Sequence, residues 1–459
     1  MTLPIGFAAV SGSARPLHVV DRMRNTGWRD ALPEAARRWV ELQGFDATPA
    51  TAIVVPGDDG TPAMALLAVG DALDPFAYAH GPQLLPVADW APAHDLPDAE
   101  RDALLLGWGL GSYRFSRYRK PLREAARLQA ELPDEVRDLL AACIRVRDLV
   151  NTPTQHMGPD ELERTVCEIA EAHGARIHVV SGEDLIDANF PAIHAVGRAS
   201  HRAPRLIRLD WGDAAHPHVA IVGKGVCFDT GGLNIKAGEG MRNMKKDMGG
   251  AAHAIALAEL LMARRVPLRI TLIVPAVENA IGPDALRPGE VIATRSGLHV
   301  EIDNTDAEGR LILGDALVHA AEDAPALLLD FATLTGAARI ALGPDLPALY
   351  ANDEAHAAQL LDAAAQVRDP LWRMPLWRPY WRYLSSGIAD FANSGPSRMA
   401  GSITAALYLE RFVPEAQPWL HMDTYAWNDA DRPGRPAGGE AQGLRAVYAM
   451  LRAFAQVGR

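Results

Sequence analysis

Charged side chains concentrate in three glycine-containing segments in the second half of the chain. The first, residues 222–236, reads Val-Gly-Lys-Gly-Val-Cys-Phe-Asp-Thr-Gly-Gly-Leu-Asn-Ile-Lys and carries Lys224, Asp229 and Lys236. Its glycines allow a sharp backbone turn and a close approach to a ligand. A phosphate-binding loop is excluded, because no Ser or Thr follows the Gly-Lys pair and no glycine stands five positions before it.

The second segment, residues 241–252, reads Met-Arg-Asn-Met-Lys-Lys-Asp-Met-Gly-Gly-Ala-Ala and places Asp247 before a helix expected over residues 250–263. An acid at a helix start is explained, taken alone, by the positive end of the helix dipole. The small residues that follow would let this helix pack closely on a sheet.

The third segment, residues 303–311, reads Asp-Asn-Thr-Asp-Ala-Glu-Gly-Arg-Leu. Asp306 and Glu308 are separated by one residue and point the same way from an extended backbone. Two carboxylates held side by side raise each other's pKa unless a cation neutralises them. Ordinary loops are also rich in Asp, Asn and Gly, so Asp306 and Glu308 indicate a functional site only in combination with the other two segments.

Together the segments supply four carboxylates at the ends of expected strands. Oxygen-rich sites of this type suit hard or borderline divalent cations, and several bridging acids suit two of them. No His-Glu-x-x-His motif is present, and the 15 histidines show no paired ligand spacing. If the chain binds a metal, carboxylates hold it.

The three segments resemble those of the leucyl aminopeptidase family of dinuclear metallopeptidases. The shared patterns are Gly-Lys-Gly-x-x-Phe-Asp-(Ser/Thr)-Gly-Gly-x-x-x-Lys, Met-Lys-x-Asp-Met-x-Gly-Ala-Ala and Asn-Thr-Asp-Ala-Glu-Gly-Arg-Leu, and every functional position is filled in order. The similarity covers residues 142–451, whereas the N-terminal third is only loosely similar. The resemblance implies hydrolysis of the N-terminal residue from short peptides by a water that two metal ions activate.

The resemblance also implies a role for each charged residue. Asp229 and Glu308 would each bridge two divalent ions, Mn²⁺ or Zn²⁺. Asp306 would bind one ion, whereas Lys224 and Asp247 would bind the other. A neutral amine is required of Lys224 in that role, and two adjacent cations would depress its pKa enough to allow it.

Further roles follow from the same resemblance. Lys236 would stay charged and polarise the scissile carbonyl, and Arg310 would hold a bicarbonate ion as general base. The positions that line the side-chain pocket in relatives are filled here by Met244, Thr333 and Gly336. The substrate's free α-amine would bind one metal, so peptides with blocked N-termini would not be cleaved.

One departure from the family concerns the pocket. Many relatives carry small residues where residues 421–428 read His-Met-Asp-Thr-Tyr-Ala-Trp-Asn. Tyr425 and Trp427 could narrow or reshape the pocket, so the preferred N-terminal residue stays open.

Alternating strand and helix patterns position these segments. Strand-like runs cover residues 176–180, 205–209, 218–222, 268–274 and 326–331, and helical patterns lie between several of them. This alternation predicts an α/β sheet with helices on both faces, whose chemistry gathers at the carboxyl ends of its strands. The family resemblance implies that the central sheet of the catalytic domain is mixed, with both parallel and antiparallel strands.

The length of 459 residues favours two domains. We predict a smaller N-terminal α/β domain over residues 1–140, with a role in oligomerisation or regulation, and a larger catalytic α/β domain over residues 141–459. In the smaller one we expect strands at 51–55 and 63–69, a loop at 82–97 and a helix at 101–111. The family resemblance implies a homohexamer.

Composition limits the environment and the partners. Three cysteines without a Cys-x-x-Cys pair fit a reducing compartment, and the N-terminus shows no secretory signal, so we expect a cytoplasmic protein. The most apolar stretch, residues 324–343, contains Asp330 and Arg339 and is not expected to span a membrane. A net charge of −12 argues against a broad nucleic-acid-binding surface.

Two other functions remain open at this stage. A dinuclear phosphatase or nuclease could use the same acids, although it would be expected to show extra histidines or a basic groove near them. A DNA-binding role would rest on basic segments such as residues 114–120, and we treat it as the less favoured reading.

Overall fold

The computed structural model describes residues 3–24, 26–397 and 399–457. The chain forms two compact units, one of Met1–Ile144 with Asp429–Ala437 and one of Arg145–Asn428 with Gly438–Arg459. The segment Asp429–Ala437 belongs to the first unit although it follows most of the second unit in the sequence. A single domain boundary in the sequence cannot describe such a division. The predicted two-domain α/β organisation is confirmed, whereas the division at residue 140 stays a prediction.

The first unit contains a six-stranded sheet. Its strands follow in the spatial order β1 (Phe7–Ala8), β6 (Arg127–Gln129), β5 (Asp89–Pro92), β2 (Arg15–Val20), β4 (Pro62–Ala68) and β3 (Ala52–Pro56). Every neighbouring pair is parallel except β3 and β4, which form an antiparallel hairpin. Both predicted strands of this hairpin are confirmed.

Among the described residues, the α-helices that lie wholly in the first unit are α1 (Glu34–Leu42), α2 (Gly81–Leu84) and α3 (Asp98–Ser112). Side chains of α1 pack with Trp28 and Leu66 in a small apolar core. The predicted helix at 101–111 is confirmed by α3. The loop predicted at 82–97 is wrong in part, because α2 extends to residue 84 and β5 occupies residues 89–92 despite the prolines.

The second unit contains a nine-stranded mixed sheet, as predicted. Eight strands follow in the order β16 (Trp372–Arg373), β15 (Ala348–Ala351), β18 (Trp419–Asp423), β14 (Leu327–Ala332), β9 (His218–Gly223), β11 (Arg269–Asn279), β8 (Arg205–Trp211) and β7 (Arg176–Ser181), and β10 (Gly225–Asp229) pairs with β11. The central strands β18, β14, β9 and β11 run parallel. Every residue of β9 is buried, as expected for a parallel strand covered on both faces.

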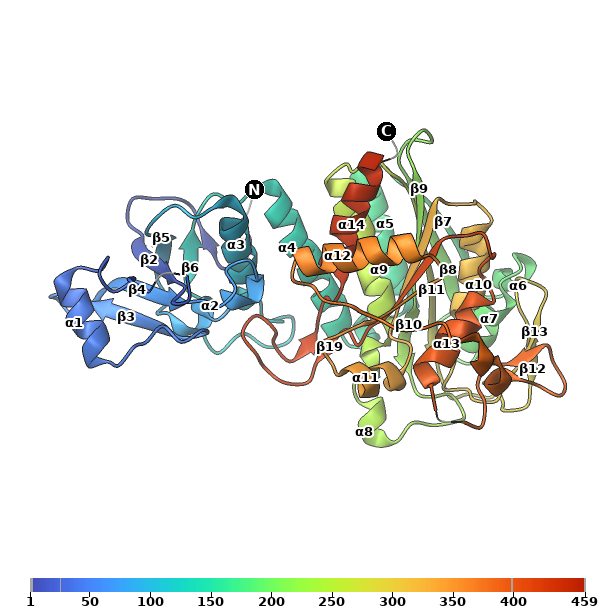
Figure 1. The fold of residues 1–459 in the computed structure, drawn as a ribbon. Helices are drawn as coiled ribbons and strands as arrows, with labels where there is room; N and C mark the ends of the chain where they lie inside the picture. Colours follow the sequence, from blue (N-terminus) through green and yellow to red (C-terminus); the bar gives the residue numbers. More distant parts are fainter. Residues whose placement is uncertain (1–2, 25, 398, 458–459) are drawn as a thin grey trace. The chain divides into compact units, whose positions relative to one another are not determined.

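Helices cover both faces of this sheet (Figure 1). On one face α9 (Gly249–Ala263) packs on β9 and β14 and contacts α5 (Pro159–His173) and α14 (Leu444–Val457). On the other, α10 (Gly309–Ala321) packs with α7 (Pro191–Gly197) and α13 (Gly401–Glu410). Most residues of α9 and α10 are buried, so each is apolar around most of its circumference.

The remaining elements are short or peripheral. They are α4 (Asp134–Asn151), α6 (Asp184–Asp187), α8 (Gly238–Met241), α11 (Gly336–Leu342), α12 (Glu354–Gln366), β12 (Val291–Ala293), β13 (His299–Glu301), β17 (Phe391–Ala392), β19 (Trp427–Asn428), β20 (Gly438–Gly439) and the 3-10 turns Pro75–Ala77, Thr154–His156, Met244–Met248 and Arg378–Leu384. Among the described residues, no helix combines the length and apolar character needed to cross a membrane.

Candidate metal centre

The three charged segments meet at the carboxyl ends of the central parallel strands. Lys224 lies between β9 and β10, and Asp229 is the last residue of β10. Asp247 lies in the 3-10 turn that leads into α9, and Asp306 and Glu308 lie in the loop before α10. The edge of the sheet at which the sequence predicts chemistry is therefore where these side chains gather.

Three of the acids approach one another closely enough to share an ion. One carboxylate oxygen from each of Asp229, Asp306 and Glu308 lies within 4.8 Å of the others. Asp229 and Glu308 are buried, and Asp306 is the more exposed member of the group. All three line a cavity of about 420 Å³, together with Asp247.

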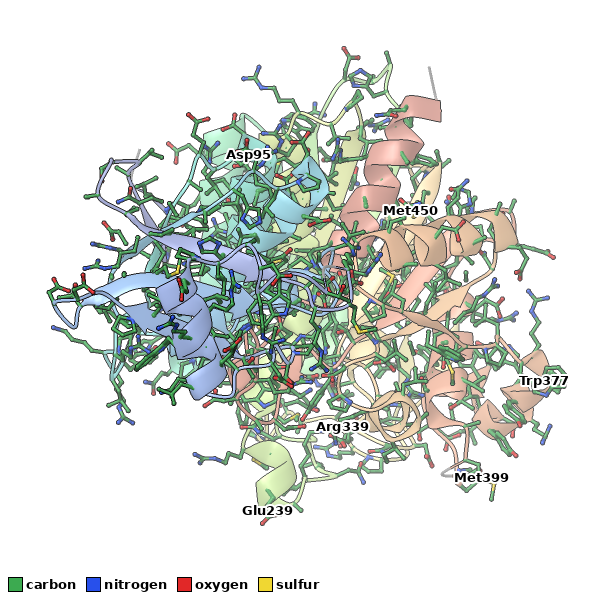
Figure 2. All side chains as sticks on the ribbon, turned by 60° about the vertical axis from the view of Figure 1, so that its left-hand side comes forward. Asp95, Glu239, Arg339, Trp377, Met399 and Met450 are labelled. Carbon is green, nitrogen blue, oxygen red and sulfur yellow. The ribbon has the colours of Figure 1, made fainter. Side chains whose placement is uncertain are left out.

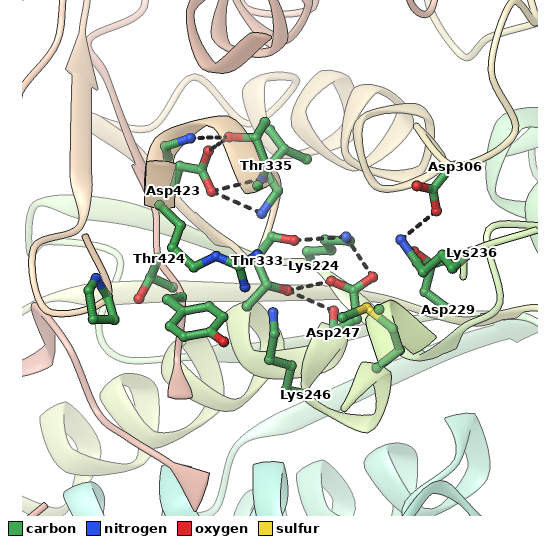
Figure 3. Close-up of a pocket in the computed structure, with 18 of the residues that line it drawn as sticks. Lys224, Asp229, Lys236, Lys246, Asp247, Asp306, Thr333, Thr335, Asp423 and Thr424 are labelled. Atoms are coloured by element: carbon green, nitrogen blue, oxygen red, sulfur yellow. Dashed lines mark hydrogen bonds and ion pairs between the residues drawn. The ribbon is translucent and has the colours of Figure 1, made fainter. Parts of the chain in front are cut away.

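Two lysines pair with these carboxylates (Figure 3). Lys224 Nζ lies 2.7 Å from Asp247 Oδ2 and 3.1 Å from Glu308 Oε1. Lys236 Nζ lies 2.8 Å from Asp229 Oδ2 and also forms an ion pair with Asp306. Each lysine thus contacts two acids that the sequence analysis assigned as metal ligands.

The pKa values of the group reflect burial and crowding. Burial, and then the charge of Asp229, raise the pKa of Glu308 to about 8 and that of Asp306 to about 6. Burial favours the neutral amine of Lys224, but Asp247 and Glu308 outweigh it and hold its pKa above the ordinary value. Burial lowers the pKa of Lys236 as well, but Asp229 and the other nearby acids outweigh it and hold the pKa above the ordinary value.

Hydrogen bonds fix the orientation of the acids. Asn279 Nδ2 and the Gly231 amide donate to Asp229 Oδ1, both at 2.8 Å. Thr333 Oγ1 donates to Asp247 Oδ1 at 2.8 Å. Sequence reasoning missed Asn279, although it ends the strand that pairs with β10 and lies opposite Asp229 in that pairing.

The donor set fits divalent cations. Four carboxylates converge, and no described residue donates a hydrogen bond to the buried Oε2 atom of Glu308. A buried carboxylate oxygen without a partner is costly, and coordination of a cation would satisfy it. The site therefore has the oxygen ligands, the negative charge and the unpartnered carboxylate oxygen that would suit a bound divalent cation.

Arg310 lies apart from the cavity lining. It is buried at the start of α10, where its Nη1 donates to the Asn393 carbonyl at 2.7 Å. No described residue accepts a hydrogen bond from its Nε. Burial lowers the pKa of Arg310 against the opposing effect of Tyr408 and Glu308.

The predicted pocket residues line the same cavity as the acids. Met244, Thr333 and Gly336 are all present, and Tyr425 joins them. The cavity also contains two cations that the sequence analysis did not assign, namely Lys246 and Arg339. Burial lowers the pKa of Lys246 to about 8.

Two family descriptions match the chain. "M17 aminopeptidase, N-terminal domain" matches residues 15–133, and "Cytosol aminopeptidase family, catalytic domain" matches residues 144–448. A probable cytosol aminopeptidase of Roseiflexus castenholzii is 37% identical over 381 residues, which cover 78% of each chain. One of Syntrophotalea carbinolica is 40% identical over 369 residues, covering 76% of this chain and 74% of the relative.

Solved structures share the fold over nearly the whole chain. The cytosol aminopeptidase of Coxiella burnetii is 45% identical, with a TM-score of 0.93 over 97% of this chain and 98% of that one. A bottromycin maturation enzyme in complex with Mn is 32% identical, with a TM-score of 0.87 over 97% of this chain and 100% of its own.

Proposed function

This chain belongs to the cytosol aminopeptidase family, and on that premise we propose that it removes the N-terminal residue from short peptides by using a water activated by two divalent metal ions. It is an aminopeptidase, a hydrolase that acts on peptides. The observation that carries the dinuclear proposal is the convergence of Asp229, Asp306 and Glu308 within 4.8 Å.

The proposed ligands would hold two ions. Asp229 and Glu308 would bind both ions, Asp306 would bind one of them, and Lys224 and Asp247 would bind the other. When bound, such ions lower the pKa of water toward neutrality and so supply a nucleophile. Mn²⁺ and Zn²⁺ both tolerate these ligands. A structural relative binds Mn, which supports the first as a candidate.

Two charged side chains, Lys236 and Arg310, are proposed to assist the reaction directly. The Lys236 ammonium is proposed to donate a hydrogen bond to the oxygen of the scissile carbonyl as negative charge develops on it. Its pairing with Asp229 in the present structure keeps it charged and close to the acids. Arg310 is proposed to hold a bicarbonate ion, for which its Nε supplies a free donor.

We further propose a homohexamer in the cytoplasm, with short peptides bearing a free N-terminus as substrates. The hexamer and the substrate length rest on the resemblance to the family. The location is supported by the name "cytosol aminopeptidase" that its relatives carry. The pocket residues are proposed to be Met244, Thr333 and Gly336, because they line the cavity that contains the acids.

The test is hydrolysis of aminoacyl amides by metal-stripped protein, with Mn²⁺ or Zn²⁺ added back. We expect release of free amino acids only with metal, and none from N-acetylated substrates. Asp306→Asn should lower kcat/KM more than about 100-fold, because it removes a ligand charge. Asp303→Asn is the matched control, since the same chemical change falls on an exposed residue of the same loop.

Metal-independent turnover, or equal activity of the two variants, would contradict the proposal. Turnover of acetylated substrates would instead remove the proposed role of the free α-amine.

A further inference from the structure

The cavity contains two cations that lack an anionic partner. Lys224 and Lys236 are each paired with acids. Lys246 and Arg339 line the same cavity, yet neither side chain forms an ion pair or hydrogen bond with a described residue. Lys246 is only 6% exposed, so its ammonium has lost most of its hydration without gaining a counter-ion.

Both cations lie against one aromatic ring. Lys246 Nζ is 4.8 Å from the centroid of the Tyr425 ring, and Arg339 Cζ is 4.7 Å from it. Cation–π contacts offset part of the desolvation cost of a buried ammonium, but they do not replace a counter-ion. A negative charge placed beside these groups would be stabilised by both of them.

The two cations lie among the residues proposed to receive the substrate's N-terminal side chain. Lys246 follows Met244 by two positions in the same turn, and its side chain points toward Thr333 (Figure 3). Arg339 lies on α11, the helix that begins at Gly336 (Figure 2). Tyr425 lines the same cavity, and its ring contacts both cations.

We propose that this subsite binds the carboxylate of an N-terminal Asp or Glu side chain, and that the enzyme prefers acidic N-terminal residues. The inference rests on the proposed aminopeptidase function and specifies its substrate class. The acids of the metal centre do not cancel this preference, because the charged Lys236 and the bound cations neutralise them. The positive charges of Lys246 and Arg339 therefore remain available to the carboxylate of the substrate side chain.

The test compares two substrates that differ only in charge, glutamyl- and glutaminyl-p-nitroanilide. Neither has a C-terminal carboxylate. We expect wild-type kcat/KM to be about tenfold higher for the glutamyl substrate, the usual range for a hydrogen bond to a charged group. Lys246→Met should bring the ratio to one or below. Arg339→Gln, at an exposed residue, should lower it by a smaller factor.

Lys245→Met is the matched control. The neighbouring Lys245 is absent from the cavity lining and donates to the Asn151 carbonyl at 2.6 Å, so its loss should leave the glutamyl-to-glutaminyl ratio unchanged. The measured quantity is the ratio of kcat/KM for two substrates on one protein sample. Partial unfolding of a variant lowers both values equally and therefore does not change the ratio.

Each other outcome overturns the proposal in a distinguishable way. A wild-type ratio of one or less, with leucyl-p-nitroanilide hydrolysed, overturns the acidic preference and leaves the aminopeptidase function standing. A Lys246→Met effect confined to the ratio of Leu-Gly to Leu-Gly-amide assigns the cations to the substrate's C-terminus instead. No hydrolysis of any substrate overturns the proposed function and this inference together.

Discussion

Lysine ammonium groups act as counter-ions among the carboxylates of the site. Lys236 contacts Asp229 and Asp306, and Lys224 contacts Asp247 and Glu308. In the proposed metal centre these ion pairs would compete with coordination, so an incoming cation would displace an ammonium from at least one acid. The lysines offset the repulsion among the carboxylates, and we expect them to lower the affinity for metal below that of the carboxylates alone.

A buried histidine in the first unit, His80, also has a shifted pKa because no described residue supplies a charged partner that would offset its burial. His80 is buried, its Nε2 lies 3.2 Å from the Thr51 carbonyl, and its Nδ1 has no partner among the described residues. Desolvation lowers the pKa of His80 to about 4, from an ordinary value of 6.5. Between these values the unfolded chain binds a proton that the folded chain does not, so the free energy of unfolding falls as the pH falls.

We therefore predict that wild-type protein loses about 2 kcal/mol more unfolding free energy between pH 7 and pH 5 than His80→Gln does. The glutamine keeps an N–H donor for Thr51 and cannot titrate. Urea unfolding of both proteins at the two pH values measures the difference, and the contributions of all other groups cancel. Equal losses in the two proteins would show that His80 is protonated in the fold.

At the scale of elements, the site depends on how closely α9 approaches the sheet. A Cβ atom on Gly250 would lie 2.2 Å from the Phe331 carbonyl oxygen, which is part of β14. A Cβ on Gly223 would lie 2.6 Å from the Cα of Ala251. Glycine at these positions lets α9 lie directly on β9 and β14, and this contact places Asp247 beside Lys224.

Gly250→Ala is expected to lower the free energy of unfolding by about 1–3 kcal/mol, because the new methyl group meets backbone atoms that cannot move aside. Gly238→Ala is the control, since a Cβ there meets nothing within 4 Å and alanine favours the helix α8. Urea titration of both variants measures the contrast. Comparable stability in the two would mean that α9 can shift away from the sheet at little cost.

Strong local patterns made the sheet predictable. Buried apolar runs such as those at residues 218–222 and 326–331 match β9 and β14 to within one residue at each end. The strand predicted at 268–274 is too short, because β11 continues through Pro275 to Asn279. Short strands such as β16 and β17 carry too few residues for any pattern to register.

The acids of the site were predictable because motif spacing fixes them within each segment. Their partners were not, since Asn279 and Asp229 are 50 residues apart and meet only through the pairing of β10 with β11. The unpaired cations were missed for the same reason. Only the fold brings Lys246 and Arg339 to the ring of Tyr425.

For the whole molecule, the family resemblance predicts an assembly of six chains. Light scattering on the purified protein should give a mass six times the 49.4 kDa of one chain. The three clustered acids, Asp229, Asp306 and Glu308, all lie within one unit of this chain. A monomeric mass with full activity would remove the hexamer from the account and leave the metal centre untouched.

The most direct test of the central claim is anomalous diffraction from crystals equilibrated with Mn²⁺. We predict two anomalous peaks per chain among Asp229, Asp247, Asp306 and Glu308, about 3.5–4 Å apart as in other two-metal sites. Two peaks at that position, with Lys236 Nζ released from Asp229, would establish the dinuclear centre. A single peak, or peaks only elsewhere on the chain, would contradict it.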